Sequence, residues 1–400
     1  MSKSFWIQKQ NFGPRPRIHH SIVYDPERRK TILFGGDSIT KGLLNDTWEW
    51  NGKNWIQLTD IGPSPRSKHS MIYDSLQKRV VLFGGNTGDG YDDGTWEWNG
   101  TNWIQIANAG PSSRAGHAMV FDSTRGKLIL FGGESIAHEL LKDTWEWNGT
   151  VWIQVESFGP ARARHVMIFD SAQNELLLFG GFNAESSLGD TWKWDGSRWI
   201  EVTSFGPTQR IYSTTAFNGL RTALFGGCDL VNKIYGDTWQ WSHGRWYQES
   251  DMGPSARWGH GMTYDTSRSV LILFGGTSSF PQDGSIDSQK IHGDTWELEW
   301  SGEGNVIPGE TQPADNQPDT PGDVIGGQPS TPTMLTAASF QISIWGICAD
   351  PSDSIYITCG GNIDAVYNSL QKLLPDASIS QVKIQTTEKF VPGGITIDTD

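Results

Sequence analysis

Cysteines, basic residues and long apolar runs are all scarce in this sequence. Only 3 of its 400 residues are cysteine, and no Cys-x-x-Cys spacing suggests a thiolate metal site or a redox pair. Asp and Glu outnumber Lys and Arg by 45 to 31, and no basic stripe appears. We therefore expect no nucleic acid and no anionic membrane as the main partner, because both require clustered cations.

The sequence also lacks membrane and export signals. No stretch is apolar enough to cross a bilayer, and residues 1–5 show no charged start before an apolar run. At face value this predicts a cytoplasmic protein, and we expect a monomer without a cofactor. Apolar residues at helical spacing are missing too, which indicates an all-β fold.

An internal repeat occupies the first three quarters of the chain. Gly-Gly doublets recur at intervals of 49, 48, 48, 46 and 49 residues, a period that is typical of propellers and solenoids. Each repeat holds four short runs rich in β-branched and aromatic residues, separated by turn signals, which predicts a four-stranded meander. The doublets begin at Gly35, Gly84, Gly132, Gly180, Gly226 and Gly275.

The second repeat illustrates the four expected strands, which we call a to d. Strand a spans about 69–73, strand b 80–83 and strand c 95–98, and strand d begins at Trp103. Asn99-Gly100, between strands c and d, is a hairpin signal in which we expect both residues to adopt positive φ.

Tryptophan is unusually abundant, and 17 of the 20 copies fall at three positions of the repeat. A sugar-binding platform is one reading, but residues that recur in every repeat are better explained by packing between neighbouring units. The first of these positions holds Trp48, Trp96, Trp145, Trp192, Trp239 and Trp296.

The D-T-W-E-W-N-G segment that closes the repeat, together with the Gly-Gly doublet, resembles the Kelch repeat in its bacterial-type form, over residues 5–300. The resemblance implies a six-bladed β-propeller in a domain that spans 1–300. The sixth repeat lacks its strand d, whereas Trp6-Ile7-Gln8 matches Trp55-Ile56-Gln57. We therefore expect the N-terminal strand to complete the last blade and close the ring.

An Arg and a His also recur in front of strand a. The His ring suggests a metal site, but one imidazole per blade spaces them too widely for one ion, and Ser213 replaces the fifth. We interpret both residues as structural, tying the d–a loop to its neighbours. They are Arg17, Arg66, Arg114, Arg162, Arg210 and Arg257, and His20, His69, His117, His165 and His260.

The residues that differ between blades are the better guide to function. In an up-and-down blade the d–a and b–c loops emerge on the same face, and loops on a rigid scaffold often carry binding residues. Between the repeated Arg and His stand two residues per blade that do not repeat. The alternative is that these are solvated loop residues. The candidates for the channel mouth are His19, Lys68, Arg164, Tyr212 and Trp258.

The sequence favours a non-catalytic binding or scaffold module whose loop face takes a protein or a carbohydrate ligand, because every strong signal is architectural. The alternative is a copper enzyme, since Kelch-type propellers include oxidases resembling galactose oxidase. Its candidate residues are Cys228, Tyr212, Tyr235, His19 and His292.

A calcium site in the second b–c loop is a weaker possibility. Asp89, Asp92 and Asp93 gather there among glycines, but their spacing is not that of a defined calcium loop.

The C-terminal quarter has a different composition. Residues 301–335 are rich in Pro, Gly, Thr and acid, which predicts a flexible linker. Residues 336–400 are expected to begin a second, incomplete β domain. The segment 346–350 (G-I-C-A-D) returns as 394–398 (G-I-T-I-D) and resembles the NHL-type propeller repeat. The chain would then stop as a new blade begins, so we expect a fragment of a longer protein.

The two cysteines of this segment flank its expected hairpin. Cys348 and Cys359 would each lie opposite a neighbour of the other, so a disulfide is possible but not required.

Overall fold

The computed structural model describes residues 6–10, 12–202, 206–250, 253–280 and 290–299, and three strands between 343 and 386. It divides into two compact units, Met1–Glu310 and Thr311–Asp400. No α-helix occurs in the described part of the chain, and accordingly none there could cross a membrane.

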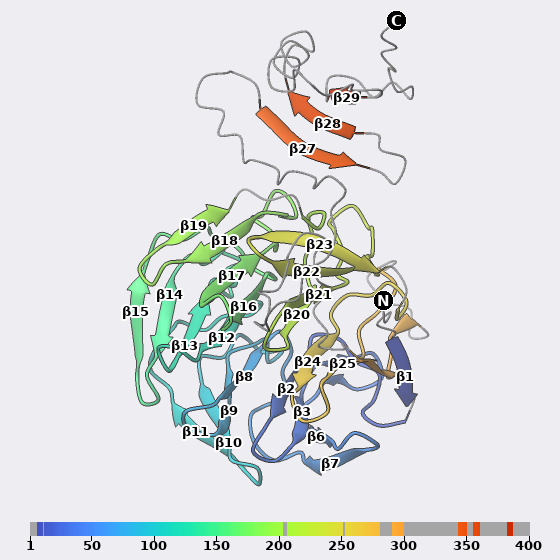
Figure 1. Ribbon diagram of the computed structural model, residues 1–400. Helices are drawn as coiled ribbons and strands as arrows, with labels where there is room; N and C mark the ends of the chain where they lie inside the picture. The colour runs from blue at the N-terminus through green and yellow to red at the C-terminus, as the bar shows by residue number, and fades with distance from the viewer. Residues whose placement is uncertain are drawn as a thin grey trace, which may run out of the picture. The chain divides into compact units, whose positions relative to one another are not determined.

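The first unit is a six-bladed β-propeller in which each blade is a four-stranded antiparallel sheet (Figure 1). A short hairpin, β4 (Asp37–Ser38) and β5 (Gly42–Leu43), extends the first b–c loop. The strands of the blades, in the order a to d, are β2 (Ser21–Asp25), β3 (Lys30–Phe34), β6 (Thr47–Trp50) and β7 (Trp55–Thr59); β8 (Ser70–Asp74), β9 (Arg79–Phe83), β10 (Thr95–Trp98) and β11 (Trp103–Ala107); β12 (Ala118–Asp122), β13 (Lys127–Phe131), β14 (Thr144–Trp147) and β15 (Trp152–Glu156); β16 (Val166–Asp170), β17 (Glu175–Phe179), β18 (Thr191–Trp194) and β19 (Trp199–Val202); β20 (Thr214–Phe217), β21 (Thr222–Phe225), β22 (Thr238–Ser242) and β23 (Arg245–Ser250); and β24 (Gly261–Asp265), β25 (Val270–Phe274), β26 (Thr295–Glu299) and β1 (Trp6–Gln10).

The N-terminal strand closes the ring, as expected from the sequence. β1 pairs antiparallel with β26, with Trp6 opposite Leu298 and Gln8 opposite Trp296. The a strands form the innermost ring, and β2 of the first blade contacts β24 of the last. Closure leaves no open sheet edge between the first and last blades.

Packing between blades uses the repeated aromatic residues. The second Trp of strand c is buried in blades one to five, and Trp241 has no exposed surface. The Trp that opens strand d donates its indole N–H to a Thr of the preceding blade, as Trp103 does to Thr47 Oγ1 at 2.9 Å. The same bond recurs from Trp152 to Thr95, also at 2.9 Å. These contacts support the interpretation of the repeated tryptophans as packing residues.

The Gly-Gly doublet is required by backbone conformation and by space. Gly84 has φ 68°, and a Cβ at this position would lie 2.8 Å from the Arg114 carbonyl oxygen and 2.8 Å from the His117 ring. Both neighbours belong to the next blade, and the carbonyl is part of the backbone and does not move easily. The doublet therefore lets adjacent blades approach each other.

We expect Gly84→Ala to lower the free energy of unfolding by about 3 kcal/mol, because it adds a clash to the strain of a left-handed residue. Gly244 is the matched control: its φ is 78°, but nothing lies within 4 Å of its Cβ position. Gly244→Ala should lower the free energy of unfolding by only about 1 kcal/mol, because it adds backbone strain without a clash. Chemical denaturation of both variants measures the difference, and equal losses would contradict the steric argument.

The turns between strands c and d differ from the expected type. Gly100 has φ 97°, but Asn99 does not have positive φ. Instead the Asn99 side chain accepts hydrogen bonds from the N–H groups of Thr101 and Asn102, at 2.9 and 3.0 Å. The prediction of two positive φ angles is therefore wrong, because a four-residue loop closed by the Asn side chain replaces the two-residue turn.

The second unit contributes three described strands, β27 (Ser343–Ala349), β28 (Ile355–Gly360) and β29 (Val382–Thr386). β27 and β28 are antiparallel, with Cys348 opposite Tyr356 and Cys359 opposite Ile344, so the expected near-opposition of the cysteines is wrong. β29 pairs parallel with β28, whereas a blade meander is antiparallel. The proposed linker, 301–335, and the second G-I-x-x-D segment, 394–398, lie outside the described residues, and the NHL resemblance stays a prediction.

Candidate functional site

Six loop residues, one from each blade, form a closed ring of backbone hydrogen bonds around the propeller axis. Each donates its N–H to the carbonyl oxygen of the equivalent residue in the preceding blade, over 2.7–3.3 Å. The ring joins all six blades through groups that every residue possesses. We call it the axial ring, and its members are His19, Lys68, Gly116, Arg164, Tyr212 and Gly259.

Every member of the axial ring has a left-handed backbone, with φ between 54° and 67°. Glycine adopts this conformation freely, whereas other residues lose about 1–2 kcal/mol. Two blades use glycine, at Gly116 and Gly259. The other four carry large functional side chains despite the strain, and all four are among the residues that the sequence analysis selected.

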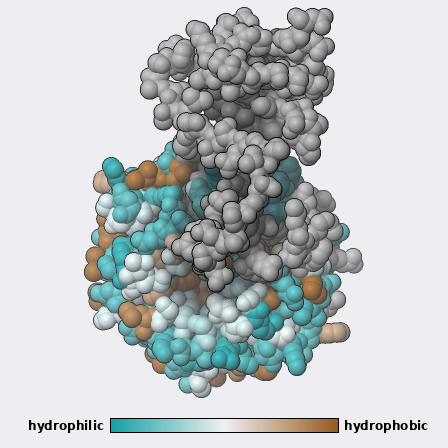
Figure 2. All heavy atoms as spheres, in the orientation of Figure 1, coloured by the Kyte–Doolittle hydropathy of each residue, from teal (hydrophilic) through white to brown (hydrophobic). Residues whose placement is uncertain are grey.

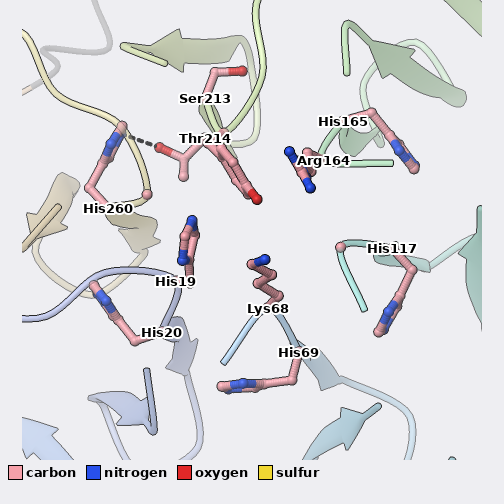
Figure 3. A pocket seen from close by; sticks show the side chains of 13 residues that line it. His19, His20, Lys68, His69, His117, Arg164, His165, Ser213, Thr214 and His260 are labelled. Carbon is pink, nitrogen blue, oxygen red and sulfur yellow. Dashed lines mark hydrogen bonds between the residues drawn. The ribbon is translucent and has the colours of Figure 1, made fainter. Parts of the chain in front are cut away.

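Four members of the axial ring line the channel mouth, a cavity of about 610 Å³ on the face where the d–a and b–c loops meet. All five sequence candidates line it: His19, Lys68, Arg164, Tyr212 and Trp258. Figure 3 shows His19, Lys68 and Arg164 inside a wider circle of histidines. On the face that Figure 2 shows, the visible propeller surface is mostly hydrophilic, with hydrophobic residues scattered singly or in small groups.

One side of the mouth is aromatic. Tyr212 and Trp258 are stacked with ring centres 5.5 Å apart, and Trp258 stacks on Phe280 at 6.0 Å. The His19 ring lies 4.4 Å from that of Tyr212. Arg164 extends this wall, because its guanidinium lies over the rings of Phe182 and Tyr212. The wall can bury an apolar or planar group of a ligand.

The other side of the mouth is polar and carries a lysine. The walls here include Asp37, Ser67 and Asn86. The Lys68 side chain makes no hydrogen bond or ion pair with any residue that the structure describes, whereas Arg164 pairs with Glu134 at 3.4 Å. Burial lowers the pKa of Lys68, and the charge of Arg164 lowers it further.

Below the mouth, the repeated histidines line a smaller cavity of about 120 Å³. Each imidazole packs against the Phe that ends strand b of the preceding blade, as His117 does on Phe83 with ring centres 5.4 Å apart. Burial lowers the pKa of His117 to about 3, with a further contribution from Arg114. His165 and His260 behave in the same way, with pKa values of about 3. These rings are therefore neutral structural groups at neutral pH.

The repeated Arg belongs to a buried network that the sequence analysis did not anticipate in full. Arg114 forms two hydrogen bonds with the Asp143 carboxylate, at 2.7 and 2.8 Å, and one with the Gly132 carbonyl. Trp145 donates its indole N–H to the same carboxylate at 2.7 Å. The Asp that directly precedes Thr-Trp in five of the six repeats was the available signal, whereas in the second repeat Gly94 stands there and Asp92 is the partner. The other pairs are Arg17–Asp46, Arg66–Asp92, Arg162–Asp190, Arg210–Asp237 and Arg257–Asp294.

This network bears on the calcium hypothesis, since Asp92 is the partner of Arg66 and accepts the N–H of Gly94 at 2.7 Å. No three His, Cys, Asp or Glu side chains gather as metal ligands in the described ranges. Asp89 and Asp93 lie in the same loop as Asp92, but they are not part of a cluster of three possible metal ligands among these residues.

Three of the residues considered for copper binding are buried or hydrogen-bonded to polar residues of their own loops. Cys228 is buried, and burial raises its pKa to about 12. Tyr235 donates its hydroxyl to Asp229 at 2.9 Å, and His292 lies 3.1 Å from the Ser278 hydroxyl. Residues 281–289 of the longest b–c loop lie outside the described residues.

The strands and loops define a six-bladed β-propeller with a cavity at the mouth of its axial channel. A family model described as the KLHDC2/KLHL20/DRC7 Kelch-repeats domain matches residues 5–148 and 95–276. The chain therefore belongs to this family of Kelch-repeat propellers. Such propellers generally mediate protein interactions and are usually non-enzymatic. No curated protein matches the sequence.

Proposed function

We propose that the protein is a non-catalytic binding module whose channel mouth takes a segment of a protein partner. The observation that carries this proposal is the composition of the axial ring. Four blades accept the strain of a non-glycine residue at positive φ and place His19, Lys68, Arg164 and Tyr212 around one cavity. Strained residues that converge on one cavity are a recognised mark of functional sites.

The walls of the mouth indicate what the segment presents. The stacked rings of Tyr212, Trp258 and Phe280 suit an apolar or aromatic side chain. The unpaired ammonium of Lys68 suits an acidic side chain, because a buried charge is stabilised by a partner. A carbohydrate could stack on the same rings, but it would leave Lys68 without a counter-charge, so we favour a protein segment.

Lys68→Gly tests the site without disturbing the scaffold. The backbone hydrogen bonds of the axial ring do not depend on the Lys68 side chain, and glycine adopts the φ of this residue, 56°, without steric strain. We expect the variant to stay within about 1 kcal/mol of the parent in unfolding free energy. Peptides selected from a display library on the full chain should bind this variant at least about tenfold more weakly, because one charge-assisted contact is lost.

Lys78 provides a matched control. It is also a lysine of the second blade with φ 56°, but it lies in the a–b turn, on the opposite face, and pairs with Glu27 at the surface. Lys78→Gly should leave peptide affinity unchanged. Equal loss in the two variants, or selected peptides that lack both acidic and apolar residues, would contradict the proposal.

A further inference from the structure

Lys68 differs from Arg164, the other cation of the axial ring, in that its side chain forms no ion pair with the described residues. Arg164 has Glu134 as an ion-pair partner at 3.4 Å and two aromatic rings beneath its guanidinium. The Lys68 ammonium has neither a hydrogen bond nor an aromatic ring beneath it among these residues. Its ammonium lies near the centre of the residues that line the smaller cavity (Figure 3).

We infer that Lys68 is a nucleophilic lysine that captures small aldehydes or ketones carrying an anionic group as a reversible imine. A lysine becomes a nucleophile when it is desolvated or placed beside another cation, because both conditions favour its free amine. Lys68 meets both conditions. It is partly buried in the wall of a cavity, and Arg164 is close enough to influence its charge.

The reaction needs no component beyond the carbonyl compound. The free amine of Lys68 bonds to the carbonyl carbon, the carbonyl oxygen takes up a proton, and the carbinolamine forms. Loss of that oxygen as water then gives the C=N bond, and addition of water reverses the step. One amine and one carbonyl thus give one imine and one water, with no change of oxidation state.

The axial ring supplies space and charge for the anionic group. Gly116 lies between Lys68 and Arg164 in the ring, and all three residues line the smaller cavity, to which Gly116 adds no side chain. Arg164 pairs with Glu134 through Nη2. Its remaining N–H groups can hold a carboxylate or a phosphate while the carbonyl reaches Lys68.

The charged groups around Lys68 set the expected pH dependence. Burial and Arg164 lower its pKa, whereas Glu134 and Asp37 act in the opposite direction and are outweighed. His19 also faces Lys68, and burial keeps its pKa well below the usual value, so it adds no positive charge at neutral pH. The free amine of Lys68 is therefore more abundant than that of a solvated lysine.

Pyridoxal 5′-phosphate is a suitable probe, because it combines an aldehyde with a phosphate. The full chain is incubated with the probe at about pH 7.5, reduced with borohydride and mapped by mass spectrometry. We expect Lys68 to be labelled at least about tenfold faster than Lys78, because its lowered pKa leaves more free amine and because Arg164 holds the phosphate of the probe beside it. Inorganic phosphate should slow the reaction at Lys68 alone, and so should replacing the probe by pyridoxal.

Arg164→Gln should slow labelling of Lys68 and remove the competition by phosphate, and Lys68→Arg should abolish the adduct while keeping the charge. Labelling of Lys68 no faster than that of Lys78 would overturn the inference. This result is separate from peptide binding, which does not need a free amine. A chain that binds peptides but is not labelled refutes only the covalent capture, and a chain that is labelled but binds no peptide refutes only the proposed function.

Discussion

Acidification from about pH 7.5 to 5.5 is expected to lower the free energy of unfolding by on the order of 7 kcal/mol. The cause is the circle of five buried histidines below the mouth. Burial lowers their pKa values, to about 3 for His117, His165 and His260 and well below the usual value of an imidazole for His20 and His69. In the unfolded chain the same imidazoles titrate near 6.5.

The sign follows from proton uptake. Below about pH 6.5 the unfolded state binds protons that the folded state does not, so stability is complete above this pH and falls as the pH is lowered. One unit below 6.5, each histidine contributes a loss of about 1.4 kcal/mol. Chemical denaturation at several pH values between 7.5 and 5.5 measures the slope of the unfolding free energy against pH.

Ser213 of the fifth blade stands in place of the repeated histidine. A serine is therefore a suitable replacement for testing one histidine of another blade. His165→Ser should reduce the slope by about one proton, or roughly 1.4 kcal/mol per pH unit below 6. A slope equal to that of the parent would show that His165 is protonated in the folded protein, or that it does not titrate in this range in either state.

Asp143→Ala is expected to lower the free energy of unfolding by about 3–5 kcal/mol, because it leaves a buried charge without a partner. Arg114 has no exposed surface, and both of its hydrogen bonds to a carboxylate go to Asp143. Burial alone raises the pKa of Asp143, but the hydrogen bonds and charge of Arg114 outweigh it and the pKa is lowered. The pair is therefore ionised at neutral pH.

The control is a surface ion pair. Lys78 and Glu27 approach within 3.0 Å, but 63% and 48% of their side chains are exposed, so Glu27→Ala should cost less than about 1 kcal/mol. A double variant, Asp143→Ala with Arg114→Met, should lose less than the sum of the two single variants, because the uncompensated charge is gone. Additive losses would argue against the buried pair as the source of the effect.

The strands could be predicted closely because each repeat carries the same local signals six times. The second repeat was expected to have strand c at 95–98, which is where β10 lies, and strand a differs from β8 by one residue. Closure by Trp6-Ile7-Gln8 could be predicted for the same reason: the segment matches a strand that the last repeat lacks. Where a feature depends on local sequence and recurs, the repeat averages out the ambiguity of any one copy.

The axial ring could not be predicted in the same way, because its hydrogen bonds join residues about one repeat apart and depend on backbone conformation. The sequence did contain a trace of it. Gly116 and Gly259 occupy the position held by Lys68 and Tyr212 in other blades, and glycine at two of six equivalent positions is typical of positive φ. The prediction for the Asn-Gly turns was wrong because the Asn99 side chain accepts a hydrogen bond from the backbone N–H of Thr101, which a two-residue hairpin turn does not contain.

The use of backbone groups alone in the axial ring has a consequence for how new specificities arise. Since no side chain holds the ring together, changes at its six codons alter what the mouth presents while the backbone hydrogen bonds of the ring are kept. A gene library that varies only these codons should yield mostly folded proteins with different ligands. Natural gene duplication and mutation could use the same property, so that a few point mutations at these positions exchange one binding partner for another.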